Sequence, residues 1–385
     1  MNRNHHRIVF NAARGQLMAV SETATGCTGS AATSEGPARS QRPTRWRKTG
    51  AAMLTALAAL NSQAQISADP TAAVNLRPTV LTSPNGVPLV NITTPSAAGV
   101  SRNVYGQFDV GTQGAILNNS RTNVQTQLGG WVQGNPWLAT GSARVILNEV
   151  NSSQPSQLNG WVEVGGQRAE VVIANPAGIQ VNGGGFINAS RATLTTGTPV
   201  MNGGNLEGYR VQRGVISVFG AGLDGTLTDH TSILARAIEV NAGLWANNLK
   251  LVIGANDISA DQGSTAQGGV SANAASAQGS VPSFALDVAQ IGGMYAGHIH
   301  LIGTEAGLGV RNHGTLSAGV GDVHIDANGW LSSTGRIEAA RGGVHIQSAH
   351  PQGQRQQHHN LRHQPHCGCH RDAQHRRRNR HPAHF

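Results

Sequence analysis

The side chains best placed to do chemistry lie near the end of a long Gly-rich body. Asp322, His324 and Asp326 alternate with apolar residues, so they would share one face of a β-strand. His300 and His345 occupy the place of His324 in the preceding and the following copy of a repeat, which would stack three imidazoles along a repeating fold. Carboxylates and imidazoles in this arrangement could bind a metal ion or perform acid–base catalysis on a polysaccharide.

The neighbouring copy of this stretch argues against that chemistry. Gly343 and Gln347 stand where the first copy has Asp322 and Asp326, so neither a carboxylate pair nor a set of metal ligands recurs. Polar side chains spaced along one outward face are usually solvated. We therefore expect no catalytic residue, no metal site, no cofactor and no enzymatic activity. A β-helical protein that binds or degrades polysaccharides is the alternative interpretation.

Two Asn-Pro dipeptides carry more information. They lie in the segments 135–138 (NPWL) and 175–179 (NPAGI). Pro fixes its own φ and an Asn side chain can hydrogen-bond to the backbone beyond it, so both segments predict turns. A purely folding role and direct recognition by a partner are both open for them. The candidate residues are Asn118, Asn119, Asn135, Pro136, Leu138, Asn175, Pro176, Gly178 and Ile179.

The composition of the chain excludes several classes of protein. Of 385 residues, 50 are Gly, and only 12% are charged and 4% aromatic, which fits a charged, helix-rich enzyme poorly. The net charge of +9 comes from the two ends, because residues 69–349 contain 13 basic and 16 acidic residues. A nucleic-acid-binding surface needs clustered basic side chains, so we expect no nucleic-acid partner.

Cysteine is also confined to the two ends of the chain. Cys27 precedes the body, and Cys367 and Cys369 follow it. Residues 69–349 contain no cysteine, so the body has no disulfide and no thiolate metal site. Packing and hydrogen bonds alone must hold it together.

An export signal precedes the body. The segment 42–48 contains four basic residues and leads into the apolar run 50–60, which is too short to span a bilayer. Small residues follow at the positions that a signal peptidase reads. We therefore predict cleavage after Ala64 and a mature chain that begins with Gln65.

Internal repeats predict the fold of the body. The segment 312–327 matches the segment 333–348, and a further copy of its central part lies upstream at 297–301. Within a unit, Val323 and Ile325 alternate with polar residues, which is the pattern of a strand with one buried face. A unit of this length cannot bury its own apolar face. Stacked coils of a parallel β-helix solve that problem and are therefore predicted.

A second repeat lies nearer the front. The segment 127–132 recurs as 157–162, and each copy leads to an apolar strand that ends in Asn. The spacing of these copies is longer and less even, which favours added hairpins. We therefore predict an all-β fold, a parallel β-helix with an N-terminal cap and antiparallel hairpin extensions over 75–250, grading into plainer coils.

Tryptophan gives one further expectation. Five Trp residues follow the export signal, and they could stack on sugars, but inward packing in caps is the commoner role. We therefore expect them to point inward. They are Trp131, Trp137, Trp161, Trp245 and Trp330.

Several segments resemble a known family. The stretches 7–11 (RIVFN) and 18–22 (MAVSE) resemble the extension on the signal peptides of very large Gram-negative exoproteins. The body adds five distinctive segments, at 103–120, 134–138, 171–179, 183–197 and 242–257. Together they closely resemble the N-terminal secretion domain of filamentous-haemagglutinin-like exoproteins, which are the exported partners of two-partner secretion systems.

This resemblance implies a fold and an export route. The family has a right-handed parallel β-helix, crosses the inner membrane through the Sec machinery, and is recognised unfolded by an outer-membrane barrel transporter with periplasmic receptor domains. Its two hallmark motifs, Asn-Pro-Asn-Leu and Asn-Pro-Asn-Gly-Ile/Met, match here at 135–138 and 175–179. Trp137 and Ala177 replace the second Asn of each motif, and the cysteine pair that related members carry after Val181 is absent.

The predicted organisation has five parts. They are a signal-peptide extension (1–24), a linker with the secretory signal (25–64), the two-partner-secretion domain (69–260), the start of a repeat rod (261–349) and a His/Arg-rich tail (350–385). The tail has no apolar face to bury, so we expect it to be disordered. We interpret it as the product of a slipped reading frame at the front of a longer exoprotein. A metal-binding tail is the alternative, since two cysteines stand among its histidines.

Taken together, these features predict a secreted exoprotein. Its class is an adhesin, a haemagglutinin or a carrier of a contact-dependent toxin, and its place is the medium or the outer-membrane surface of a Gram-negative bacterium. The surface of a host or bacterial cell is a further expected partner.

Overall fold

The computed structural model describes residues 6–11, 16–21, 65–260 and 272–349. The chain divides into two compact units, Met1–Ala59 and Leu60–Phe385. In the first unit, β1 (His6–Asn11) pairs antiparallel with β2 (Gln16–Ser21). The tail at 350–385 and most of the export signal lie outside the described residues.

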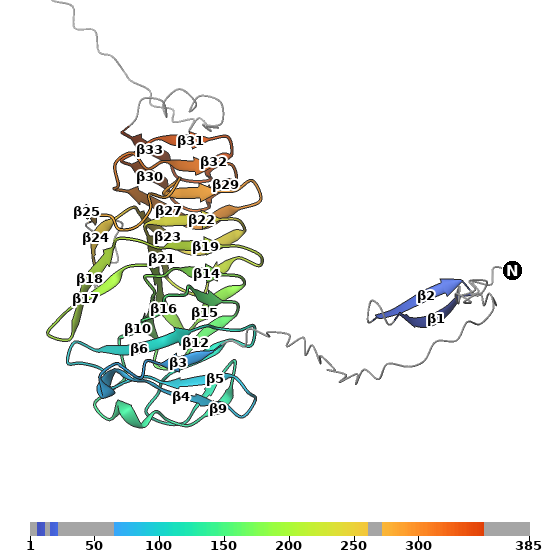
Figure 1. The fold of residues 1–385 in the computed structure, drawn as a ribbon, viewed down its shortest axis with the longest axis vertical. Coiled ribbons are helices and arrows are strands. Elements are labelled where there is room, and N and C mark those ends of the chain that lie inside the picture. Colours follow the sequence, from blue (N-terminus) through green and yellow to red (C-terminus); the bar gives the residue numbers. More distant parts are fainter. Residues whose placement is uncertain (1–5, 12–15, 22–64, 261–271, 350–385) are drawn as a thin grey trace, which may run out of the picture. The chain divides into compact units, whose positions relative to one another are not determined.

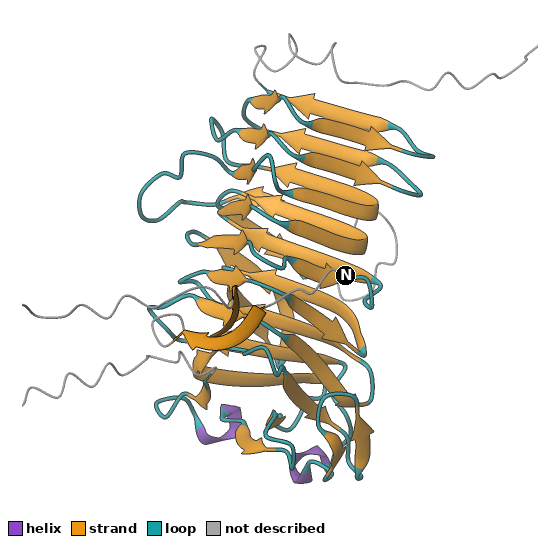
Figure 2. Cartoon of the chain, turned by 90° about the vertical axis from the view of Figure 1, so that its right-hand side faces the viewer, coloured by secondary structure: helices purple, strands orange, loops and turns teal. Residues whose placement is uncertain are grey.

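The second unit is a parallel β-helix, as predicted (Figures 1 and 2). Its strands lie on three faces. One face is a seven-stranded sheet of β11 (Ser156–Leu158), β14 (Ile179–Val181), β19 (Val215–Val218), β22 (Ala237–Val240), β26 (Leu286–Val288), β28 (Val310–Asn312) and β31 (Leu331–Ser333). All six pairings within it are parallel. Each pairing joins one coil, or rung, to the next.

The other two faces belong to one 18-stranded sheet. The second face contains β6 (Val100–Phe108), β10 (Val145–Val150), β13 (Ala169–Ala174), β16 (Ala189–Thr195), β21 (His230–Ala235), β30 (Val323–Ala327) and β33 (Val344–Ser348). The third contains β5 (Pro88–Asn91), β7 (Ala115–Asn119), β12 (Trp161–Gly166), β15 (Gly184–Ile187), β20 (Leu223–Gly225), β29 (Thr315–Ala318) and β32 (Arg336–Ala339). The long strands β23 (Gly243–Ile253) and β27 (Gly293–Gly303) run across both faces.

The repeats near the end of the body are stacked rungs, as the sequence predicts. Leu316 pairs with Ile337, and Val323 pairs with Val344. Val323 and Ile325 are fully buried, and Val344 packs partly buried against the same core. Inward aliphatic side chains thus form one continuous hydrophobic cluster along the axis, which is how the fold buries apolar area that no single rung could bury.

The N-terminal end of the helix is covered by a cap. β3 (Ile66–Ala68) pairs antiparallel with β6, and β4 (Thr79–Thr82) pairs antiparallel with β5. The remaining cap elements are the 3₁₀ turns η1 (Val74–Leu76) and η2 (Pro136–Leu138) and the hairpin of β8 (Val124–Thr126) and β9 (Gly130–Val132). Such a cap protects the edge that an open stack of parallel strands would expose.

The repeat seen between 127–132 and 157–162 is not a structural repeat. The first copy lies in the β8–β9 hairpin, whereas the second runs from β11 into β12. The Glu163 carboxylate explains the arrangement, because it accepts hydrogen bonds from the backbone N–H groups of Gln127 (2.7 Å) and Leu128 (2.8 Å). The hairpin therefore lies on the outside of β12 instead of forming a rung beneath it.

A four-stranded antiparallel sheet extends from the side of the helix. It consists of β17 (Thr198–Asn202), β18 (Asn205–Val211), β24 (Asn256–Ser259) and β25 (Ala272–Ala274). A second hydrophobic cluster joins it to the outward side of the second face, through residues such as Val145, Leu147 and Tyr209. Since Ile146 faces the inner core, β10 is buried on both sides. This explains its uninterrupted apolar start.

The prediction that the tryptophan side chains point inward is wrong. Trp131, Trp137 and Trp245 are 67%, 51% and 40% exposed, and Trp161 and Trp330 are only half-buried. Aliphatic side chains, with Tyr105, Phe108 and Phe186, fill the interior instead. Within the described ranges, no helix is long and apolar enough to cross a membrane.

Candidate functional site

The Asn135 turn belongs to the cap. The Asn135 Oδ1 atom accepts a hydrogen bond from the Trp137 backbone N–H (3.0 Å), which caps η2. Its Nδ2 group donates to the carbonyl oxygens of Ile92 (2.9 Å) and Asn118 (3.0 Å). The side chain is 2% exposed. A buried amide with all of these partners fixes the turn, and its loss would leave two carbonyls unpaired.

Asn118 and Asn119 extend the same network at the end of β7. Asn118 Nδ2 donates to Asn91 Oδ1 and to the Gln133 carbonyl, both at 2.8 Å. Asn119 Nδ2 donates to two carbonyl oxygens, and its Oδ1 accepts from the Ala143 N–H (2.7 Å). Both side chains are fully buried. Asn118 and Asn135 therefore form one hydrogen-bonded corner, and Asn119 beside them bonds separately to Ala143 and Gln167.

The other residues of the first motif differ in their exposure. Leu138 is fully buried in the main hydrophobic cluster. Pro136 is exposed, and the exposed indole of Trp137 donates through Nε1 to Thr79 Oγ1 (3.0 Å). In the folded protein, only the middle of this motif is therefore open to a partner.

The Asn175 turn lies between β13 and β14. Asn175 Oδ1 accepts from the Ala177 N–H (2.9 Å), and Nδ2 donates to the Gln154 carbonyl and to Ser156 Oγ, both at 3.0 Å. Gly178 has φ +123°, and a Cβ there would lie 2.8 Å from the Val215 carbonyl oxygen. This position therefore requires glycine.

The second motif ends inside the core. Ile179 is fully buried, whereas Pro176 is only half-buried. Asn175 bonds to the preceding rung, and none of these partners belongs to the corner around Asn135. The two motifs thus use the same chemistry at separate places along the helix.

The replaced asparagines do not break these turns. In each motif the Asn side chain receives a backbone N–H, from Trp137 in one case and from Ala177 in the other. The backbone N–H of the residue at this position can donate this hydrogen bond whether its side chain is Asn, Trp or Ala. The turn geometry therefore survives both departures from the family pattern.

The histidine column exists as predicted. His300 pairs with His324, and His324 with His345, with ring centroids 5.0 and 6.1 Å apart. Burial, followed by electrostatic interaction with Lys250 and His324, lowers the pKa of His300 to about 4, and Asp326 opposes this shift. Within the described part of the chain, no group of three or more His, Cys, Asp and Glu side chains could hold a metal ion.

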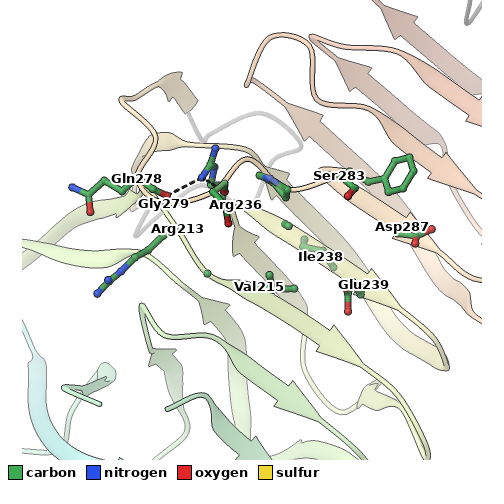
Figure 3. A pocket seen from close by; sticks show the side chains of 14 residues that line it. Arg213, Val215, Arg236, Ile238, Glu239, Gln278, Gly279, Ser283 and Asp287 are labelled. Carbon is green, nitrogen blue, oxygen red and sulfur yellow. Dashed lines mark hydrogen bonds between the residues drawn. The ribbon is translucent and has the colours of Figure 1, made fainter. Parts of the chain in front are cut away.

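A cavity of about 370 Å³ opens on the side of the helix (Figure 3). Its lining includes Arg213, Arg236, Glu239 and Asp287. Arg236 is 3% exposed and bonds to the Glu305 carboxylate (2.9 and 3.1 Å), so its charge is already neutralised. Asp287 is likewise paired with Arg311. The arrangement provides neither a nucleophile–base pair nor a pair of free carboxylates.

Comparisons with known proteins agree with this architecture. Residues 64–333 match the model of the TPS secretion domain, and residues 1–64 match that of the extended signal peptide of the type V secretion system.

The chain belongs to the TPS secretion domain family.

Individual relatives place this TPS domain within larger proteins. It is 51% identical over 350 residues to the toxin CdiA of Yersinia pestis, and 44% identical over 347 residues to the tRNA nuclease CdiA-2 of Burkholderia pseudomallei. These alignments cover 89% and 88% of this chain but only 10% and 11% of the relatives. The chain thus spans about a tenth of the length of these relatives.

A solved structure supports the same assignment. The crystal structure of the filamentous hemagglutinin secretion domain matches with a TM-score of 0.59 and 31% identity, over 73% of this chain and 98% of that one. An extended signal peptide followed by a TPS domain makes this a secreted protein that leaves the cell by the two-partner route. The family has an outer-membrane transporter as its partner.

Sequence reasoning missed a third set of buried amides in this TPS domain. The Tyr105 hydroxyl donates to Asn148 Oδ1 (3.0 Å), and Asn148 Nδ2 donates to the Val172 carbonyl (3.0 Å). Asn103 Oδ1 accepts from the Thr93 N–H (2.8 Å). Burial raises the pKa of Tyr105, which keeps its hydroxyl a donor. The available signal was the Asn that directly follows the apolar run 145–147.

Proposed function

We propose that residues 69–260 are the address that an outer-membrane transporter reads through its periplasmic receptor domains. The burial of the asparagine amides is the observation that carries this proposal furthest. Asn118, Asn119 and Asn175 have no exposed surface in the folded protein, and Asn135 has 2%. A receptor could contact these side chains only before the helix folds. Recognition therefore precedes folding, and folding hides the address afterwards.

The flanking parts have supporting roles. Residues 1–24 and 25–64 direct the chain to the Sec machinery, and cleavage after Ala64 releases a mature chain that starts at Gln65. The two family models meet at residue 64, which supports this position. Residues 261–349 begin the surface rod, and 350–385 form the tail. The TPS model continues to residue 333, across the boundary that we place at 260.

The finished exoprotein is a carrier of a contact-dependent toxin, with a host or bacterial cell surface as its target. The names of the two relatives above support this choice over a haemagglutinin. We infer that the activity in those names belongs to parts of the relatives that this chain does not match, and that the TPS domain itself is not an enzyme. Assaying the purified TPS domain for tRNA cleavage would test this, since cleavage would contradict it.

Asn175→Ala separates recognition from folding. If the amide is read by the transporter, the variant should refold in vitro yet reach the medium several-fold less than the wild type when the transporter is coexpressed. Replacing Asn148, which forms similar buried bonds outside both motifs, gives a matched control.

The mass of the exported wild-type protein should correspond to a chain beginning at Gln65.

Two results would contradict the proposal. Equal export losses for Asn175→Ala and Asn148→Ala, both in proportion to lost stability, would leave only a folding role for the motif. An exported protein that retained Met1 would refute the cleavage site.

A further inference from the structure

An exposed aromatic pair lies on the third face of the helix. Trp245 on β23 and Tyr295 on β27 are paired on adjacent rungs and are 40% and 41% exposed. Their neighbours in sequence, Leu244 and Met294, are fully buried, so the two rings point outward. The ring centroids are 6.3 Å apart and the planes differ by 17°.

The indole lies along the surface of the sheet. A Cβ at Gly243 would come within 2.2 Å of Trp245 Cη2, and a Cβ at Gly222, on the preceding rung, within 3.0 Å of Cζ3. The ring therefore occupies space above two successive rungs. Tyr295 covers Gly293 in the same way, with its Cε2 2.8 Å from the place of a Cβ. The two rings are nearly parallel, and both are partly exposed to solvent.

Polar side chains continue the column at both ends. The register places Asp224 on β20 before Trp245, and Ser317 on β29 and Glu338 on β32 after Tyr295. Asp224 uses Oδ1 to accept from Thr226, and no described residue donates to its Oδ2. Glu338 accepts from Ser317 Oγ (3.0 Å) and pairs with Arg336. No described group accepts from the Trp245 Nε1–H or the Tyr295 hydroxyl.

We propose that this column binds a neutral, linear glycan laid along the axis of the rod. A pyranose ring has apolar C–H faces that stack on aromatic rings, and its edge carries hydroxyls that donate to carboxylates and accept from indole N–H. Adjacent rungs are about 4.8 Å apart, a distance comparable to one pyranose unit, so the four steps from β20 to β32 span about 19 Å. The carboxylate of Asp224, which has no described ion-pair partner, repels acidic sugars.

Binding of defined hexasaccharides tests the proposal. The secreted protein is titrated calorimetrically with cellohexaose and chitohexaose, and with a hexamer of galacturonic acid as the acidic contrast. Neutral hexamers should bind, and the acidic one should not. Trp245→Ala should weaken binding about tenfold, the effect expected when one stacked ring is lost. Tyr295→Phe keeps the ring and should change affinity by less than about threefold.

A matched variant and a second readout keep the test decisive. Trp131→Ala removes another exposed indole, in the cap, and should leave binding unchanged. Cellohexaose should also protect the fluorescence of Trp245 from quenching by acrylamide. Trp245→Phe should abolish this protection, which gives a readout even if Trp245→Ala misfolds. Failure of folded wild type to bind either neutral hexamer overturns the proposal. The proposal is also overturned if Trp245→Ala binds the neutral hexamers as tightly as the wild type does. A dimer that depends on Trp245, in a protein that binds no sugar, would overturn it as well. Export defects are scored separately, so this result is independent of the proposed address function.

Discussion

Buried asparagine side chains tie neighbouring rungs together at the corners of this helix. A strand can pair its own backbone with the next rung, but the chain at a corner turns away and leaves carbonyl groups unpaired. Asn119 donates to the carbonyls of Ala143 and Gln167, which are 24 and 48 residues away in sequence. Asn175 donates to the carbonyl of Gln154, which is 21 residues away. An amide suits this task because it offers two donors and an acceptor without the cost of burying a charge.

The half-buried His300 gives the rod a pH dependence. Its pKa is about 4 in the folded protein, against about 6.5 when unfolded, because burial and the nearby Lys250 and His324 disfavour the charged ring. The unfolded chain therefore binds the proton first as the pH falls. The free energy of unfolding should be highest above pH 6.5 and should decrease between pH 6.5 and 4, by roughly 1 kcal/mol after allowance for solvent screening.

Urea unfolding at pH 7 and pH 5 measures this effect. His300→Gln, which cannot be protonated, should flatten the difference between the two midpoints. His313→Gln replaces an exposed corner histidine and should keep the wild-type difference. An unchanged difference in His300→Gln would show that other groups control the acid response.

At the scale of elements, a buried ion pair adds to the hydrophobic contacts of the extension sheet by holding the connection that follows it against the helix. Arg236 donates to Glu305 and, through Nη1, to the carbonyls of Gln278 (2.8 Å) and Ser280 (3.0 Å), which lie on the connection from β25 to β26. Burial by itself would raise the pKa of Glu305, but the hydrogen bonds from Arg236 and the Ala255 N–H lower it overall. The pair thus remains ionised and holds three segments together.

Arg236→Met should therefore be strongly destabilising. It leaves the Glu305 carboxylate without its partner and frees two carbonyls, a loss of about 3 kcal/mol in the free energy of unfolding. Chemical denaturation measures the change. Arg210→Met breaks the exposed pair with Asp257 and should cost less than about 1 kcal/mol. Similar losses for both variants would mean that the buried pair has no special role.

The sequence predicted some of these elements and not others. The last rungs were predictable because Val-His-Ile at 323–325 recurs at 344–346 and side chains of period two fix the register. The 127–132 and 157–162 pair was misleading, since similar residues serve a hairpin in one copy and a rung in the other. The extension sheet joins β18 to β24, which are far apart in sequence, so no local pattern could reveal that pairing. The roles of Asn118 and Asn135 were likewise set by long-range contacts.

At the scale of the whole molecule, the absence of cysteine from 69–349 fits passage through a narrow pore. A disulfide that closed a large loop would hinder the threading of an extended chain. Ser217 and Glu239 face each other on adjacent rungs, with Oγ and Oε2 separated by 3.0 Å. Rung spacing places their Cα atoms at a distance that a disulfide can bridge.

Replacing both residues with cysteine should therefore block export. Ser217→Cys with Glu239→Cys should reduce the secreted amount several-fold in an oxidising periplasm, and added reductant should restore it. Either single variant should be exported normally. Efficient release of the disulfide-bonded protein would contradict threading of an extended chain, and with it the proposal that recognition precedes folding.

The in-register stacking of the last repeats makes the length of the rod adjustable. His324 follows the same geometry as His345 on the next rung, so removing one such stretch would bring the next into the vacated place with every pairing preserved. Each excision would shorten the rod by about 4.8 Å. Duplication or loss of whole repeats can therefore change the length of the rod while the packing of the hydrophobic core stays the same.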